Sequence, residues 1–92
     1  MTPPKFPLGQ LVSTPGALDA LTKTGTSPQD FLDRHVRGDW GELSDEDRKE
    51  NDFSVTRNLR ILSCYRLSDG TKIWIITEAD RSSTCILLPE EY

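Results

Sequence analysis

The chain has little of the material from which disulfide frameworks, zinc sites and membrane spans are built. Its 92 residues include two cysteines, Cys64 and Cys85, and one histidine, His35. Two cysteines are too few for a disulfide-stapled domain or, by themselves, for a structural zinc site. No apolar run approaches the roughly 18 residues of a membrane span, and the start MTPPKFPLGQ lacks the basic-then-apolar layout of a secretion signal. We therefore expect a cytoplasmic protein with reduced thiols and no membrane contact.

The sequence also lacks the short signatures of several enzyme classes. It contains no phosphate-binding glycine loop, no HExxH, no GxSxG and no cysteine pair at metal spacing. Nucleotide hydrolysis, zinc proteolysis and esterase chemistry therefore have no recognisable motif. Carboxylates that could hold a metal are present, but solvation of a surface helix explains them more simply. We expect no bound metal and no cofactor.

Negative charge is concentrated in one stretch of the chain. The formal net charge is -4, and residues 39–52 hold seven of the 15 acids but only two of the 11 lysines and arginines. The rest of the chain is close to neutral and has no basic stripe of the kind that tracks phosphates. A protein partner is therefore favoured, with a nucleic acid as the alternative.

Helix-start signals dominate the first half of a chain that is long enough for one domain, residues 1–92. Residues 1–13 are rich in proline and favour an extended arm over a helix. Three capping residues follow as predicted helix starts, namely Thr14, Ser27 and Ser44. Proline comes directly after the first two caps, and Gly25 and Gly38 are placed to end those two helices.

The period of the apolar residues changes from Leu59 onward. The stretches LRILSCYRL, KIWIIT and STCILL are rich in β-formers and are separated by SDG and EADRS, which favours three strands joined by tight turns. The predicted fold is α+β, with about three short N-terminal helices packed on a C-terminal three-stranded antiparallel β-meander.

One candidate site surrounds the only histidine, in the stretch RHVRGDW. A histidine near a carboxylate such as Asp39 can be tuned for proton transfer near neutral pH. The alternative is structural and is favoured by the residues: Gly38 ends the helix, His35 balances the helix dipole and Trp40 fills the core.

A second candidate site is the turn in TEADRSST, where Arg81 is flanked by Glu78, Asp80 and Ser82. A turn explains Asp and Ser without any chemistry. An arginine at the end of a sheet can also bind a phosphate or an acidic group of a partner. An internal salt-bridge network and a binding site are equally compatible with these residues.

A basic surface with aromatic stacking groups is the third candidate site. Its members are Arg57, Arg60, Arg66 and Arg81, with Tyr65 and Trp74 as stacking groups. Because the chain is acidic overall, scattered solubilising charge is the favoured interpretation.

Longer strings of the sequence carry a family resemblance. In order they are RHxxGDWGEL, DxxxN and RILSxYxLxDGTKIWIITEADRSxTxILLPEEY. The chain resembles, over Phe6 to Tyr92, a family of small bacterial plasmid-related proteins that occur on plasmids and integrated mobile elements. The resemblance implies a bacterial cytoplasmic protein carried by mobile DNA, and it implies no particular activity. The residues that match the family pattern are Arg34, His35, Gly38, Asp39, Trp40, Asn51, Arg60, Tyr65, Glu78, Asp80, Arg81, Ser82 and Thr84. Cys85 stands where the pattern has threonine, which argues against an essential hydroxyl there.

Three functional hypotheses follow. The first is a non-enzymatic protein-binding module that acts on host or defence machinery through the acidic stretch, which could imitate the phosphate spacing of DNA. Its predicted binding residues are Asp39, Trp40, Asp45, Glu46, Asp47, Arg60, Asp80, Arg81 and Ser82. The second is a metal-independent endoribonuclease of toxin-like layout, a fold-level analogy. Its residues would be His35 or Glu78 as general acid or base, Arg81 and Arg60 on the phosphate, and Tyr65 or Ser82 to orient it. The third is a structural subunit of a larger assembly. The oligomeric state is left open.

Overall fold

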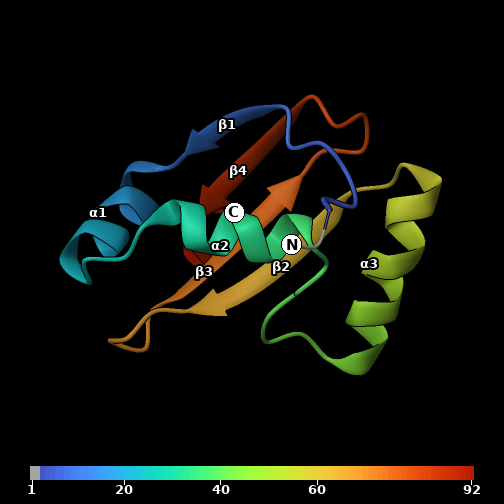
Figure 1. Cartoon of the computed structure of the whole chain (residues 1–92). Coiled ribbons are helices and arrows are strands. Elements are labelled where there is room, and N and C mark those ends of the chain that lie inside the picture. The colour runs from blue at the N-terminus through green and yellow to red at the C-terminus, as the bar shows by residue number, and fades with distance from the viewer. Residues whose placement is uncertain (1–2) are drawn as a thin grey trace.

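The sheet is mixed and four-stranded, with the strand order β1-β4-β3-β2 (Figure 1). The computed structural model describes residues 3–92, so residues 1 and 2 of the predicted arm lie outside the described range. The strands are β1 (Gln10–Ser13), β2 (Ile61–Arg66), β3 (Lys72–Thr77) and β4 (Ser83–Leu87). The helices are α1 (Pro15–Lys23), α2 (Pro28–Val36) and α3 (Asp45–Arg57), and a short 3₁₀ helix, η1, spans Pro89–Glu91. The chain is thus a small α+β unit.

The sheet differs from the predicted antiparallel meander because part of the N-terminal arm is a strand. β2, β3 and β4 pair antiparallel as expected, but β1 pairs in parallel with β4. The Gln10 amide donates to Ser82 O at 2.9 Å, and the Thr14 amide donates to Ile86 O at 2.9 Å. The extended backbone after the prolines satisfies the outer hydrogen-bonding groups of β4, which would otherwise form an open edge.

The helices start at the predicted caps but are placed differently. Thr14 and Ser44 accept hydrogen bonds from the amides of Ala17 and Asp47, and Ser27 occupies the cap of α2. Figure 1 shows α1 and α2 over one face of the sheet, whereas α3 stands beside the β2 edge. The three helices therefore follow a strand and do not form one N-terminal layer.

The main core lies between the sheet and the first two helices. Side chains of alternate strand positions point to this inner face. The core residues are Ala17, Leu21, Phe31, Leu32, Tyr65, Leu67, Ile73, Ile75 and Ile86. Both cysteines are free thiols, Cys64 buried and Cys85 partly buried. No helix within residues 3–92 has the length and apolar composition to cross a bilayer.

A smaller apolar cluster joins the arm, the loop before α3 and the first residue of β2. It contains Phe6, Trp40 and Ile61, with Leu43 and Val55 packed against it. Phe53 on α3 is half exposed. Because Asn51 and Ser54 are the buried residues of α3, polar contacts hold much of this helix to the sheet.

The outer edge of β2 is closed by the Asn51 side chain and by a single parallel β-bridge between Cys64 and Gly41. The Asn51 side chain donates to Leu62 O at 2.6 Å and accepts from the Leu62 amide at 3.3 Å. Two residues further along, the Cys64 amide donates to Trp40 O at 3.1 Å, and the Glu42 amide donates to Cys64 O at 2.7 Å. The outward N–H and C=O groups of Leu62 and Cys64 are thereby satisfied.

Candidate functional site

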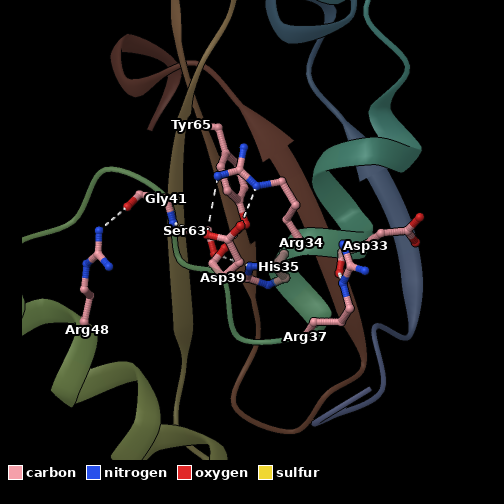
Figure 2. A network of polar contacts seen from close by, with 9 residues as sticks. All are labelled: Asp33, Arg34, His35, Arg37, Asp39, Gly41, Arg48, Ser63 and Tyr65. Atoms are coloured by element: carbon pink, nitrogen blue, oxygen red, sulfur yellow. Dashed lines mark hydrogen bonds and ion pairs between the residues drawn. The ribbon is translucent and has the colours of Figure 1, made fainter. Parts of the chain in front are cut away.

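His35 is fully buried and lies on the sheet side of α2. Its Nδ1 is 2.5 Å from Ser63 Oγ, and its Nε2 is 2.9 Å from Thr77 Oγ1. Figure 2 shows the imidazole directed at Ser63 on β2. Thr77 Oγ1 is in turn 2.8 Å from Thr84 Oγ1, and the Thr84 hydroxyl donates to Leu8 O at 2.7 Å. A continuous hydrogen-bond chain thus crosses the inner face of the sheet to the N-terminal segment.

The donor and acceptor roles along these hydrogen bonds identify which nitrogen of the neutral His35 carries the proton. A carbonyl oxygen only accepts, so Thr84 donates to Leu8 and accepts from Thr77. Thr77 then accepts from His35 Nε2, which carries the proton, and Nδ1 accepts from Ser63. Burial, reinforced by the charge of Arg81, lowers the pKa of His35 to about 3.

His35 therefore links α2 to the sheet through Ser63 and Thr77, and the structure does not support its predicted proton-transfer role. A buried imidazole with both nitrogens engaged reaches no substrate, and its pKa lies far below neutral. Its predicted balancing of the helix dipole is also wrong, because that role requires a charged imidazolium.

Arg81 serves as an internal brace. Its φ is +61°, and its Nη1 donates to Leu59 O at 2.7 Å and to Glu78 O at 3.0 Å. Its Nη2 donates to Ser54 O at 3.0 Å near the C-terminal end of α3. The guanidinium joins the turn after β3 to α3, which leaves it unavailable as the predicted phosphate clamp.

Asp80, Ser82 and Glu78, the other predicted residues of this turn, have local structural roles or lie away from His35. Asp80 Oδ1 accepts from the Ser82 amide at 3.0 Å, and the Ser82 side chain and backbone hold the pKa of that carboxyl below its usual range. Glu78 is exposed and belongs to the outer face, because it continues the strand two residues after Ile76. The Glu78 side chain therefore lies on the opposite face of the sheet from Thr77 and its partner His35. His35 and Glu78 share no cleft, which removes the main support for the endoribonuclease hypothesis.

Asp39 and Tyr65 belong to a polar cluster at the end of α2 (Figure 2). Arg34 Nε donates to Asp39 Oδ2 at 2.7 Å, and this partner lowers the pKa of Asp39. The Tyr65 hydroxyl donates to Asp39 O at 2.5 Å, and burial raises the pKa of Tyr65 to about 12. Trp40 is buried, and its indole donates to Asp52 Oδ1 at 3.1 Å. Trp40 and Tyr65 are thus buried and hold the loop in place, whereas Asp39 is exposed but engaged by Arg34.

The first turns of α3 hold acids that remain available. Asp45, Glu46, Asp47 and Glu50, which we call the acidic group of α3, are exposed, and none forms an ion pair within residues 3–92. The nearby Arg48 does not neutralise them, because it donates to Gly41 O at 2.7 Å and to Leu43 O at 3.1 Å (Figure 2). Asp45, Glu46 and Asp47 were among the predicted binding residues, and Glu50 joins them through its place on α3.

A groove of about 410 Å³ lies beside the acidic group, between α3 and the outer face of the sheet. It is lined by Glu50, Asn51, Ser54, Arg60, Leu62, Trp74, Ile76 and Tyr92. The Trp74 and Tyr92 rings meet edge to face at 5.7 Å between centroids, and Arg60 Nη1 donates to Tyr92 Oη at 2.7 Å. Arg60 also pairs with Glu78 at 3.6 Å. The groove therefore offers an apolar floor with charged side chains at its rim.

Sequence reasoning named Arg60 and Trp74 but not the groove that contains them. The alternation along KIWIIT does place Trp74 and Ile76 on one face. The contributions of Glu50, Ser54 and Tyr92 depend on how α3 and the C-terminal residues meet the sheet, which no local pattern encodes.

The chain matches no protein-family model, no curated protein and no solved structure. Within residues 3–92 no three His, Cys, Asp or Glu side chains are grouped to hold a metal ion.

Proposed function

We propose that this chain is a non-enzymatic protein-binding module whose helix α3 binds a positively charged surface on a partner protein. The supporting observation is the acidic group of α3, which keeps four exposed carboxylates without an ion pair in residues 3–92 while Arg48 is turned into the preceding loop. Carboxylates in the first turn of a helix also stabilise that helix through its dipole. The same charges thus favour a well-formed helix and long-range attraction of a cationic partner.

The groove beside α3 adds an apolar contact to this electrostatic one. Glu50 belongs to both the acidic group and the groove lining. A partner that places a lysine or arginine against α3 can therefore insert a neighbouring apolar side chain against Trp74. Charges of this kind set the association rate and specificity, while a desolvated apolar anchor slows dissociation.

The resemblance to plasmid-related proteins supports a host or defence protein as the partner. Proteins that bind nucleic acids present cationic surfaces to phosphates, and exposed carboxylates on a helix are complementary in charge to such a surface.

The proposal is tested by capture from bacterial lysate on the immobilised chain, quantified by mass spectrometry. The test variant is D45N/E46Q/D47N/E50Q, and the matched control removes four acids elsewhere as D19N/D30N/D33N/E90Q. We expect partners that the wild type and the control retain and the test variant loses, with binding that weakens at least about tenfold between about 50 and 500 mM salt. Equal loss in both variants, or binding that ignores salt, contradicts the proposal. Circular dichroism of both variants checks that α3 stays helical.

A further inference from the structure

The two edges of the sheet are treated differently. Asn51 and the loop before α3 close the β2 edge, whereas the β1 edge has no neighbour beyond it in Figure 1. The amides of Gln10 and Thr14 bond toward β4, so the alternation of a strand turns the N–H and C=O groups of Leu11 and Ser13 outward. Within residues 3–92 these N–H groups donate to no other element, and these C=O groups accept from none.

The β1 edge also lacks the usual protective residues. Its sequence, QLVS, contains no charge and no proline, and its pairing with β4 is regular. Leu11 is 50 % exposed and Val12 is 43 % exposed. Shortness is the one device that limits this edge, since β1 has four residues.

We propose that β1 pairs antiparallel with β1 of a second copy of this chain, about a two-fold axis at Val12. Leu11 then faces Ser13 of the second copy, and Ser13 faces its Leu11, so that each pair exchanges both hydrogen bonds. The two Val12 residues meet at the axis as a non-hydrogen-bonded pair, where side chains approach closely. The two four-stranded sheets join into one continuous sheet.

A groove next to β1 can hold the Leu11 side chain of the second copy. It has a volume of about 330 Å³ and is lined in part by Ser13, Pro28, Leu32 and Ile86. Ser13 is in register with Ile86, so its side chain lies on the inner face of the sheet. Leu11, two residues earlier, points to the same inner face. Leu11 of the second copy, opposite Ser13, therefore enters this apolar groove. The interface is self-complementary, as a two-fold contact must be.

The distribution of charge favours a second copy as the occupant. The chain carries a net charge of -4, but its acidic group lies on α3, beside β2 at the opposite edge of the sheet. Two copies that meet at β1 bring together uncharged strands and keep their acidic helices at the far ends. Like-charge repulsion between copies is therefore small at this edge.

Sedimentation velocity and light scattering of the purified full chain from about 10 µM to about 1 mM test the dimer. We expect the mass to rise from 10.4 kDa toward twice that value. V12K and V12E should each stay monomeric, because like charges would face each other at the axis. An equimolar mixture of V12K and V12E should associate again, because opposite charges then meet. The control L18K changes a leucine on α1 that is as exposed as Leu11, and it should leave the dimer intact.

Three results would overturn the proposal. They are a monomer at every concentration, a dimer that V12K leaves unchanged, and a dimer that L18K disrupts as strongly as V12K. A monomer that instead binds an extended peptide at β1 would also reject the second copy as occupant. Because none of these measurements involves the acidic group of α3, their outcome is independent of the proposed function.

Discussion

Asn51 on α3 binds both peptide groups of Leu62 on β2, donating to its carbonyl at 2.6 Å and accepting from its amide at 3.3 Å. One side chain thus acts as a two-bond substitute for a neighbouring strand and fixes α3 to the sheet edge. The Asn51 side chain is almost completely buried, so water does not replace these bonds readily.

Removal of this amide should destabilise the fold and loosen α3. N51A leaves two strand groups without a partner, and we expect a loss of about 1–3 kcal/mol in the free energy of unfolding. Urea denaturation measures this loss, and Q29A at an exposed position of α2 serves as the control. N51D keeps the acceptor but loses the donor and should also destabilise. Wild-type stability in N51A would contradict the role assigned to this side chain.

The neutral His35 predicts how stability depends on pH. The unfolded imidazole takes up a proton near pH 6.5, whereas the folded one does so only near pH 3. The unfolded state therefore binds more protons between these values, and stability falls as the pH is lowered, by up to about 1.4 kcal/mol per pH unit. Since His35 is the only histidine, H35Q should flatten this slope between about pH 5 and 6.5.

Urea midpoints of the wild type and H35Q across this pH range give the comparison. Glutamine offers one donor and one acceptor to the neighbouring hydroxyls, so the slope is compared rather than the absolute stability. If both proteins show the same slope, His35 is not buried in its neutral form.

Arg81 combines an unfavourable backbone with favourable side-chain bonds, and two substitutions separate these effects. R81A loses the bonds to Ser54 O and Leu59 O and keeps a side chain at φ +61°, so we expect a loss of about 1–3 kcal/mol. R81G loses the same bonds but relieves the backbone and should be about 1 kcal/mol more stable than R81A. Thermal unfolding of both, with R60A as an exposed-arginine control, tests the order. R81A as stable as the wild type would contradict the brace.

Gly41 lets the loop before α3 run against β2. A Cβ at this position would collide with Cys64 O, and its φ is +75°. Gly25 has a similar φ of +64° but nothing within 4 Å of such a Cβ. G25A should lower the free energy of unfolding by the roughly 1–2 kcal/mol of a left-handed alanine. G41A should lower it by clearly more, because it adds the collision with Cys64 to the same backbone strain. Equal losses in denaturant unfolding would mean that the loop moves away freely.

The helix starts were predictable because they depend on local chemistry. Ser44 accepts from the amide three residues on, and Pro28 sits where a missing amide is harmless. β1 was missed since its four residues show no alternation, and its place in the sheet depends on β4, far along the chain. A strand of this length is determined by its partner rather than by its own propensity.

The candidate sites were predicted as stretches of sequence, and the structure divides them by what each side chain contacts. The spacing of His35 from Phe31 and Leu32 puts it beside the apolar face of α2, and the structure buries all three residues. Its hydroxyl partners come from three strand positions that only the paired sheet brings together. Arg81 looked available because its carbonyl acceptors are invisible in a sequence. The acidic group of α3 was recognisable, since repulsion among like charges keeps such a cluster in solvent.

The parallel pairing of β1 with β4 has a consequence for the order in which the molecule assembles. β2, β3 and β4 follow one another through short turns, whereas β1 is separated from β4 by all three helices and two strands. Local pairs close with less loss of chain entropy, so we expect β2, β3 and β4 to pair with one another before β1 docks. Until then the outer edge of β4, with Ile86 and Leu87 beside it, lies open to strands of other molecules. The N-terminal segment therefore acts as a late shield, and a nascent chain is most prone to aggregate just before that segment docks.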